Sequence, residues 1–579
     1  MSHRLPVVNA KWIKSVPIWI CAAAIGLACL TQCLLRSFRG AQFFQRLEWI
    51  AYDWRMQTAH HFQPPVSDKL GFVCIGDDAI SLFSHGTLGT NFLFGLKWPR
   101  HIYGRAVREL KAQGATAVGL DILFDDRRLD HGPESDLFFA EQLKQAANVV
   151  IGATKQVAPD KLFSDAASVL GELSHERDSD GVLRRDFAFR DYRIWHSAIQ
   201  QEAALRGWDL ANSIVESNRI IFARVPASNL ESAGQGNGPT VLSLNPDGYF
   251  DPTDLSRDKT ASGFVRLFKP FEQVRVWHLG IVLAARALNL DLEKASVQLE
   301  NGEITLPGPK GLRRVLPVDR HGQFLIDWTV QLTDPRLAKE SFERLIANDI
   351  LRQHGEQIAP VFAGKLVVIG STATGNELTD RGATPLEKDA FLTSNYWNVV
   401  NSLLTDRFIQ QSACGTDLLL IGLLGLSAGF LTWKLRAIWA SLLVGVLVLG
   451  WVLLALFLFV RFRWWVPMIL PGGVALLTHF ALLTYQTFFE QNERRRVRTI
   501  FAKLVSPNVV HELLKAPKLS LVGARGQVTV FFADVRGFTE LTDRSHAQAE
   551  DYVRAHQLGP ADAKMYFDQQ AQEIGRAHV

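Results

Sequence analysis

The stretch Ile102–Phe124, IYGRAVRELKAQGATAVGLDILF, decides the fold of the long middle region of this chain. Its first half carries apolar residues at helical spacing, and Gly114 follows where a helix would end. Its second half, Ala117–Phe124, is a short apolar run typical of a buried strand, and Leu70–Ile75 (LGFVCI) is another. A strand, a helix and a strand in this order predict a parallel β-α-β unit and therefore an α/β domain.

Further apolar runs extend this pattern along the chain. These strand candidates are Val149–Gly152, Gln323–Trp328 and Leu366–Ile369. Four carboxylates, Asp53, Asp77, Asp121 and Asp125, are expected at strand ends, where they line a ligand crevice or cap helices. The sequence leaves these two roles open.

The size and composition of the chain indicate a membrane protein with several domains. The chain has 579 residues, more than one hydrophobic core usually supports. Its 62 basic and 58 acidic residues give a formal net charge of +4, and no sustained basic tract indicates nucleic acid binding. Hydrophobic residues make up 47% of the chain and concentrate in four apolar blocks of spanning length.

The predicted membrane spans are residues 16–35, 415–435, 438–460 and 466–489. The first follows a basic N-terminus, residues 1–15, and lacks a small-residue cleavage site, which favours an uncleaved anchor over a signal peptide. With the N-terminus in the cytoplasm, residues 40–410 lie outside and the C-terminus returns inside. The distribution of basic residues supports this orientation, with Arg461 and Arg463 as exceptions.

Other candidate sites have weaker patterns. The five cysteines make a poor disulfide framework and are expected to pack as apolar side chains. Asp178–Gly181 (DSDG) resembles the start of a calcium loop, but no glutamate follows at the required spacing, so a structural turn is expected. The histidines that show no metal-ligand spacing are His60, His61, His85 and His101.

The middle region also carries a series of short motifs. They are Tyr52-Asp53-Trp54-Arg55, Gly76-Asp77-Asp78, Trp98-Pro99-Arg100, GATAVGLDILFDD from Gly114, DSDGVLR from Asp178, VDRHGQFLID from Val318, GKLVVIGSTATG from Gly364 and Thr384-Pro385-Leu386. Together they resemble the second class of CHASE domains, which are extracytoplasmic sensors of bacterial cyclases and kinases. The resemblance covers most of residues 45–405 and is weakest between about 207 and 275. It implies a CHASE-type sensor domain over residues 40–410, whose extracytoplasmic ligand stays unknown.

A different pattern follows the last span. Residues 490–520 are predicted to form a helical signalling linker, and Val528–Thr539, VTVFFADVRGFT, then leads an apolar strand into the lone carboxylate of Asp534 and a turn. A carboxylate before such a turn can hold divalent ions that stabilise negative charge developing on phosphate oxygens. The alternative is a buried strand whose acid caps the next helix.

This stretch, behind the lead-in VSPNVVHELL from Val505, closely resembles the opening motif of class III nucleotide cyclases. The resemblance implies the start of an α+β ferredoxin-like cyclase domain, with Asp534 and the backbone carbonyl of Val535 as ligands of two Mg²⁺ or Mn²⁺ ions. The phosphate-binding amides would belong to the turn Gly537, Phe538 and Thr539, with a helix beginning near Thr539. The resemblance also implies ATP or GTP as substrate, a homodimer, and a multi-pass location in the bacterial inner membrane.

The residues after this motif do not complete the family's pattern. No second metal-binding aspartate and no transition-state Asn and Arg follow, so no catalytic set is complete, and Tyr552–Gln572 is predicted to be a helical insert. The end, 573–579 (EIGRAHV), reads like a translated sequencing adapter, so residues 525–572 are expected to be a truncated cyclase domain and this chain alone inactive. A non-catalytic transmembrane receptor is the alternative. A transporter is disfavoured because the last three spans show no membrane-buried acidic residue.

Overall fold

A computed structural model describes residues 10–37, 42–84, 98–128, 132–155, 159–224, 240–252, 267–374, 380–504 and 536–576, together with positions 255, 529 and 531. The chain divides into two compact units, Met1–Phe489 and Glu490–Val579.

The first unit contains a six-stranded sheet with the order β15-β1-β16-β2-β3-β4, in which every pairing is parallel. The strand bounds are β1 Leu70–Ile75, β2 Ala117–Leu123, β3 Val149–Ala153, β4 Val169–Glu172, β15 Ala338–Ser341 and β16 Leu366–Ser371. The central strands are short apolar runs because both faces of a parallel sheet are buried. The predicted β-α-β unit is confirmed: α4, Arg100–Ala112, connects β1 to β2, and β16 lies between the two strands. Gly114 follows α4 with φ of +82°, a conformation that favours glycine.

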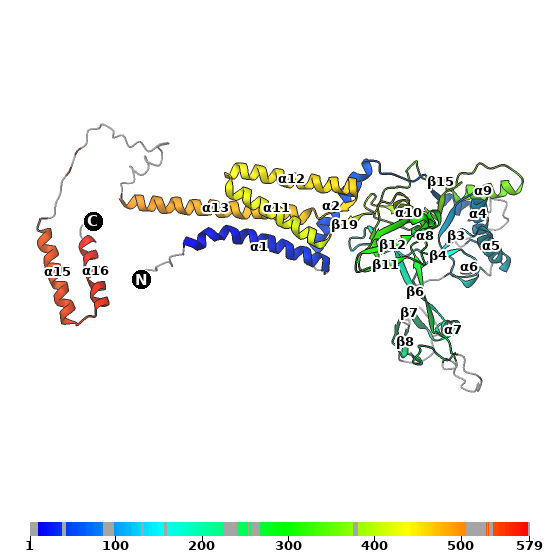
Figure 1. Cartoon of the computed structure of the whole chain (residues 1–579), viewed down its shortest axis with the longest axis horizontal. Helices are drawn as coiled ribbons and strands as arrows, with labels where there is room; N and C mark the ends of the chain where they lie inside the picture. Colours follow the sequence, from blue (N-terminus) through cyan, green and yellow to red (C-terminus); the bar gives the residue numbers. More distant parts are fainter. Residues whose placement is uncertain are drawn as a thin grey trace. The chain divides into compact units, whose positions relative to one another are not determined.

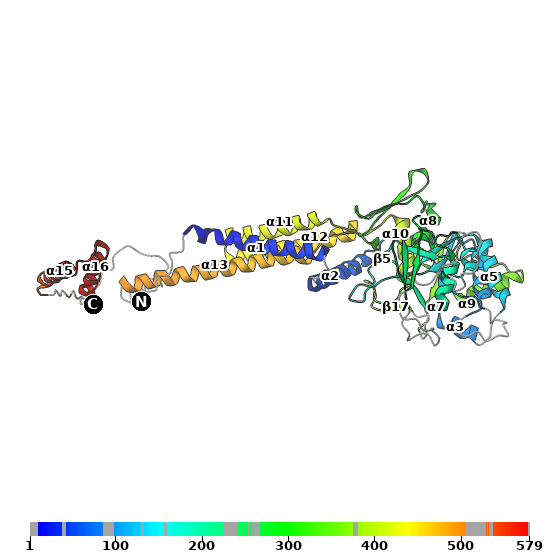
Figure 2. The same ribbon diagram turned by 90° about the horizontal axis from the view of Figure 1, so that it is seen from below.

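Helices cover both faces of the sheet (Figures 1 and 2). Those on one face are α4, α5 (Pro133–Ala146) and α9 (Phe342–Gln353), and those on the other are α8 (Leu279–Leu288) and α10 (Ser394–Thr405). Each face of the sheet has its own hydrophobic core. Alternate residues of β1 contribute to different cores, because successive side chains of a strand point to opposite faces. Leu70 and Phe72 pack with α8 and α10, whereas Val73 and Ile75 pack with α4, α5 and α9.

Helices α8 and α10 approach each other closely at Gly280. A Cβ added there would lie 2.7 Å from the carbonyl oxygen of Tyr396 and 2.9 Å from Cβ of Val399. Glycine at this position therefore sets the distance between the two helices.

The predicted strand Gln323–Trp328 is wrong in its extent. The strand β14 covers only Gln323–Leu325 and pairs antiparallel with β5, Arg185–Phe187, outside the large sheet. The backbone then follows other partners: the amide of Ile326 donates to the carbonyl of Arg184 at 3.0 Å, and no ladder continues. The apolar run is buried for packing, and a run of this length does not distinguish a strand from a buried loop.

A smaller lobe projects from the sheet domain (Figure 1). Two antiparallel strands, β6 (Phe189–Trp195) and β10 (Phe271–Trp277), lead to it. Its elements are α7 (Ser197–Arg206), β7 (Trp208–Val215), β8 (Arg219–Arg224) and β9 (Thr240–Ser243). The lobe has its own core, in which Trp208 stacks on Phe222 with ring centroids 4.5 Å apart. It lies in the part of the sequence where the CHASE resemblance is weakest.

The remaining elements of this unit are short. They are α3 Asp77–Ser84, α6 Lys161–Ser164, β11 Ser296–Gln298, β12 Glu303–Pro307, η4 Pro309–Gly311, β13 Arg313–Pro317, β17 Arg381–Gly382, β18 Ala390–Phe391, β19 Gln410–Gln411 and β20 Trp464–Trp465. Strand β19 pairs with β20, which joins the end of the sheet domain to the loop between two apolar helices.

Among the described residues, four helices are long and apolar enough to cross a membrane. The apolar segments are Val16–Arg36, Cys414–Lys434, Ala437–Phe462 and Ile469–Phe489. They belong to α1 (Ala10–Ser37), α11 (Cys414–Lys434), α12 (Ala437–Phe462) and α13 (Ile469–Leu504) and lie where the sequence predicts spans. A further helix, α2 (Gln42–His61), follows α1 and leads into the sheet domain.

The described part of the second unit is helical. It contains the end of α13, then α15 (Phe538–Ala555) and α16 (Pro560–Arg576). Tyr552 stacks on Tyr566 with ring centroids 4.5 Å apart, which pairs the last two helices. The helical insert predicted for Tyr552–Gln572 is helical apart from the turn between α15 and α16.

Candidate functional site

The carboxyl ends of the parallel strands meet at one edge of the sheet, which is where open α/β sheets bind ligands. Asp77 begins α3 directly after β1 and accepts hydrogen bonds from the backbone amide and the hydroxyl of Thr374, which follows β16. These hydrogen bonds hold the pKa of Asp77 below its ordinary value. Asp77 therefore connects the ends of two neighbouring strands.

Asp121 lies on β2 beside this edge. Its carboxylate and the hydroxyl of Thr393 both lie against Gly370, which has no side chain to displace them. Burial raises the pKa of Asp121, and the carboxylate of Asp380 adds to this rise. Thr393, His175 and Tyr396 act in the opposite direction, and the resulting pKa is about 6.

His175 follows β4 at the same edge, and its Nε2 lies 3.3 Å from Oδ2 of Asp380. Burial lowers the pKa of His175, but the hydrogen bond to Asp380 and the charges of Asp186, Asp380 and Asp121 outweigh it and raise the pKa to about 9. An imidazolium therefore lies among these carboxylates at neutral pH.

A second cluster of polar side chains lies near His175 and Asp380. The side chains of Asp186, His278 and Asn395 are almost fully buried, and Asn395 donates a hydrogen bond to Asp186. Nε2 of His278 lies 3.4 Å from Oδ2 of Asp186, and its Nδ1 accepts from the amide of Gly280 at the start of α8. The group thus ties α8 and α10 to β5.

Glu172, at the end of β4, is fully buried. Its Oε1 accepts from the amide of Ser174 at 3.0 Å, whereas its Oε2 and Oδ1 of Asn395 have no hydrogen-bond partner in the described part of the chain. Burial raises the pKa of Glu172. Two buried acceptors at this end of the sheet therefore lack hydrogen-bond partners among the described residues.

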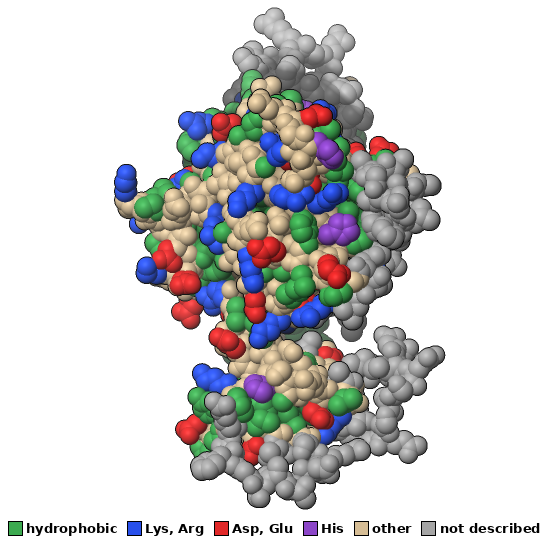
Figure 3. All heavy atoms as spheres, turned by 90° about the vertical axis from the view of Figure 1, so that its right-hand side faces the viewer, with side chains coloured by type: hydrophobic (Ala, Val, Ile, Leu, Met, Phe, Trp, Pro, Cys, Tyr) green, Lys and Arg blue, Asp and Glu red, His purple; other side chains and the backbone are tan. Residues whose placement is uncertain are grey.

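The geometry gives no support to a metal site at this edge. Among the described residues, no group of three His, Cys, Asp or Glu side chains is arranged to hold a metal ion. A shallow depression with room for about one water molecule lies nearby and is lined in part by Trp328, Thr384, Phe391 and Ser394. The face of the domain at the right-hand side of Figure 1 is seen directly in Figure 3. Acidic and basic side chains are interspersed on it, without a large patch of either charge.

The other predicted acids have different positions. Asp125 is exposed after β2. Asp53 was expected at a strand end, and this is wrong: it lies within α2. Asp178 and Asp180 form a structural turn, as expected, and both pair with Arg184.

Arg184 connects α2 to the sheet domain. Its Nε and Nη2 donate to the two carboxylate oxygens of Asp53 at 2.8 and 2.7 Å, and its Nη1 donates to Asp178 at 3.1 Å. The guanidinium also lies over the ring of Trp49 on α2, with Cζ 5.0 Å from the ring centroid. Burial would lower the pKa of Arg184, but Asp53 and Asp180 hold it above its ordinary value.

Helix α2 also holds the start of α13. The carboxylate of Glu48 accepts from the backbone amides of Met468 and Ile469 at 3.0 Å each, where a helix start leaves amides unpaired. Arg55, fully buried, donates to Glu48 at 2.7 Å and to the carbonyl of Val466 at 2.8 Å. The loop between α12 and α13 is therefore fixed to α2 by charge-assisted hydrogen bonds.

Two ion pairs close this junction. Arg463 is 3% exposed, and its Nε donates to Oδ2 of Asp327 at 2.9 Å. This buried partner explains one of the two basic residues that contradict the predicted charge bias. Asp417, in the first turn of α11, is fully buried and pairs with Arg36 of α1 at 2.6 Å. Asp417 is therefore an acidic residue buried at the start of an apolar helix, and Arg36 of the first apolar helix neutralises it.

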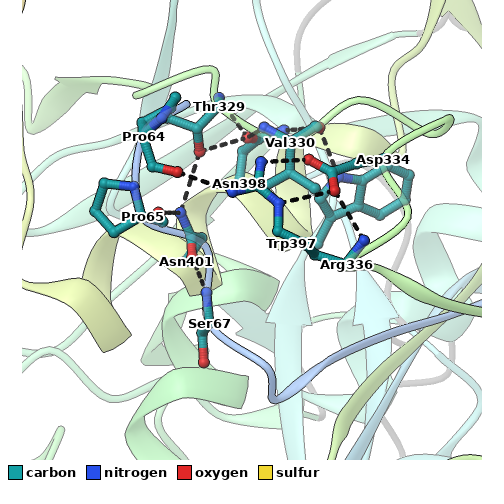
Figure 4. A network of polar contacts seen from close by, with 10 residues as sticks. All are labelled: Pro64, Pro65, Ser67, Thr329, Val330, Asp334, Arg336, Trp397, Asn398 and Asn401. Atoms are coloured by element: carbon teal, nitrogen blue, oxygen red, sulfur yellow. Dashed lines mark hydrogen bonds and ion pairs between the residues drawn. The ribbon is translucent and has the colours of Figure 1, made fainter. Parts of the chain in front are cut away.

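Helix α10 completes the junction from the sheet side (Figure 4). The side-chain oxygen of Asn398 accepts from the amides of Thr329 and Val330, both at 2.8 Å. Asn401 accepts from the amide of Ser67 and donates to the carbonyl of Pro65, in the segment between α2 and β1. The network thereby fixes this connection from α2 to the core of the domain.

Sequence reasoning missed His175, Glu172, Asp186 and Asn395. Glu172, His175 and Asp186 lie in or follow strands too short to recognise by periodicity, and Asn395 lies on α10. The run of polar residues in Ser394–Asn401, on a helix that is otherwise apolar, was the available signal.

The proposed cyclase residues are described only in part. Asp534 and Val535 lie outside the described residues. Gly537 has φ of +75° and precedes α15, which begins at Phe538 and includes Thr539. The helix predicted to begin near Thr539 is therefore present.

The fold and these contacts define a membrane protein in which an α/β domain is fixed to four apolar helices. The chain belongs to the CHASE2 domain family, whose match covers residues 24–457, more than half of its length. The family supports a sensor domain of a signalling receptor. No curated protein and no solved structure matches the chain.

Proposed function

We propose that this chain is the sensor and membrane part of a receptor nucleotide cyclase, with residues 40–410 outside the bacterial inner membrane and the C-terminal residues in the cytoplasm. The reaction would convert ATP or GTP to its cyclic nucleotide and pyrophosphate. The observation that carries this proposal is the stretch Val528–Thr539 beyond the last span of a CHASE2 protein. The match to the family ends before this stretch, so the activity rests on the motif.

The donor set of the motif fits magnesium or manganese. The carboxylate of Asp534 and the carbonyl of Val535 are oxygen ligands, which Mg²⁺ prefers. Two bound ions would supply charge stabilisation at the 3′-oxygen and the leaving pyrophosphate. At the turn, the positive φ of Gly537 brings the backbone to the start of α15, whose first amides have no partner within the helix and suit phosphate oxygens.

The helices offer a route for control. Helix α13 continues without interruption from the apolar segment to Leu504, so the proposed linker begins as part of a span. In a homodimer, two copies of this helix would position the two halves of a shared site. The ligand of the sensor would act through the contacts of α2 with the start of α13.

The test is the product of the complete gene, expressed in membranes and assayed for cyclic AMP and cyclic GMP with Mg²⁺ or Mn²⁺. The substitution Asp534→Ala is expected to abolish product formation, whereas Asp543→Ala, at an exposed position of α15, is expected to retain it. Genomic sequence downstream of Gln572 shows whether a second metal-binding aspartate follows. If the protein encoded by the complete gene binds no nucleotide and makes neither cyclic AMP nor cyclic GMP, the alternative of a non-catalytic transmembrane receptor stands.

A further inference from the structure

The sensor-side end of α12 carries more basic charge than its acidic partners neutralise. Three arginines gather there: Arg461 in the last turn of α12, Arg463 directly after it, and Arg407 in the segment before α11. The carboxylate of Asp327 lies 2.9 Å from Nε of Arg463 and 4.0 Å from Nε of Arg407.

The charges of these groups are close enough to affect each other. Burial lowers the pKa of Arg407, and the neighbouring guanidiniums of Arg463 and Arg461 lower it further, against the effect of Asp327. The other acid in this segment, Asp406, lies 3.6 Å from Arg314 instead. Arg463 and Arg407 therefore share one carboxylate, and Arg461 has no ion pair among the described residues, which leaves an excess of two positive charges.

A second observation indicates a missing anion. Nη1 of Arg463 has no hydrogen-bond partner in the described part of the chain, although this side chain is 3% exposed. A buried guanidinium N–H without an acceptor costs free energy that a bound oxyanion would recover.

The position of the cluster identifies the source of the anion. Arg461 lies in the last turn of an apolar helix, beside Phe462, which is 59% exposed, and close to Trp464, which is 37% exposed. Tryptophan side chains such as that of Trp464 are enriched at the level of lipid headgroups, where the phosphates are. A guanidinium matches the geometry of a phosphate because it can donate two parallel hydrogen bonds.

We propose that Arg407, Arg461 and Arg463 form a binding site for the phosphate group of an anionic lipid on the sensor side of the membrane. The site would hold the lipid against the loop between α12 and α13, the same loop that α2 fixes through Glu48 and Arg55. The proposal does not depend on the cyclase activity or on which side of the membrane the sensor occupies. It also gives a role to Arg461, which the charge bias of the spans leaves unexplained.

The test measures lipid binding to the full chain in a neutral detergent by native mass spectrometry. Phosphatidylglycerol, diacylglycerol and inorganic phosphate are the three probes. The double variant Arg407→Gln/Arg461→Gln removes the excess charge and leaves the pair of Arg463 with Asp327 intact. A matched control, Arg320→Gln/Arg344→Gln, removes the same charge from exposed positions of the sheet domain.

Phosphatidylglycerol is expected to bind the unmodified chain and the control equally, and the double variant about 30-fold more weakly, as two charges of about 1 kcal/mol each imply. Diacylglycerol, which lacks the phosphate, is expected not to bind. If inorganic phosphate at equal concentration displaces the lipid, the three arginines still form an anion site, but its ligand is free phosphate. The proposal would be overturned if the double variant and the control bound phosphatidylglycerol equally well. It would also be overturned if the unmodified chain bound diacylglycerol. Circular dichroism of both variants checks that they are folded.

Discussion

Replacing Arg184 by Met tests whether α2 is held to the sheet domain by charge. The side chain of Arg184 is 2% exposed and faces Asp53, Asp178 and Asp180. Removing one partner of a buried ion pair typically costs about 3 to 5 kcal/mol, because the remaining charge stays buried without compensation. Asp53 and Asp180 keep exposed fractions of 21% and 26%, so water relieves part of this cost, and we expect about 3 kcal/mol.

Hydrogen exchange of the full chain in lipid nanodiscs measures this cost locally. If α2 opens as a unit, about 3 kcal/mol corresponds to a loss of about 150-fold in the protection of its backbone amides. The substitution Arg184→Lys keeps the charge but not the two parallel hydrogen bonds to Asp53, and is expected to lie between the unmodified chain and Arg184→Met.

The matched control is Arg275→Met, which breaks a pair with Asp191 whose side chains are 41% and 49% exposed. Exposed pairs contribute at most about 1 kcal/mol, so α2 should keep its protection. The reasoning is refuted if Arg184→Met lowers the protection of α2 no more than Arg275→Met does.

Three further substitutions have expected outcomes that thermal unfolding in one detergent measures. The pKa of His175 is raised to about 9, so its protonated form stabilises the fold fully below about pH 6.5, and this stabilisation is lost as pH rises through 9. His175→Gln should therefore flatten the dependence of stability on pH across this window. An unchanged slope would contradict the pairing of His175 with the carboxylates. Gly280→Ala forces α8 from α10 and should cost about 1 to 3 kcal/mol, whereas Gly445→Ala, with no atom within 4 Å of the added Cβ, should not. Asp417→Ala leaves Arg36 without its carboxylate and should lower the unfolding midpoint, with Asp417→Asn less severe; equal midpoints for all three proteins would show that the pair contributes nothing.

Local patterns in the sequence were sufficient for the parts of the fold that depend on neighbouring residues. The β-α-β unit was predictable because each of its parts has its own sequence pattern. A buried strand is an apolar run, as in β2; a packed helix has periodic apolar residues, as in α4; and a positive φ favours glycine, as at Gly114. The same holds for the helix that begins at Phe538. The order of strands in the sheet was not predictable, because β16 enters between β1 and β2 from a position more than 240 residues after β2.

Charged residues were harder to place because their roles depend on distant partners. Asp53 was assigned to a strand end, yet the residue that determines its role, Arg184, is 131 positions away. Arg463 was interpreted from the charge bias of the spans alone, and Asp417 was not singled out. Their partners, Asp327 and Arg36, neutralise them in the folded chain. A single sequence records the cost of burying a charge but not the residue that compensates for it.

These pairings make α2 the mechanical connection between the sheet domain and the apolar helices. Asp53 on α2 is held by Arg184, and Glu48, five residues earlier, holds the amides of Met468 and Ile469. In a helix this separation is about 7.5 Å along the axis, so the two attachments lie on one rigid segment. Sliding either attachment by the length of a hydrogen bond would leave a buried charge without a partner. We therefore expect that a displacement of Arg184 would be passed to the start of α13, because both attachments lie on the same helix.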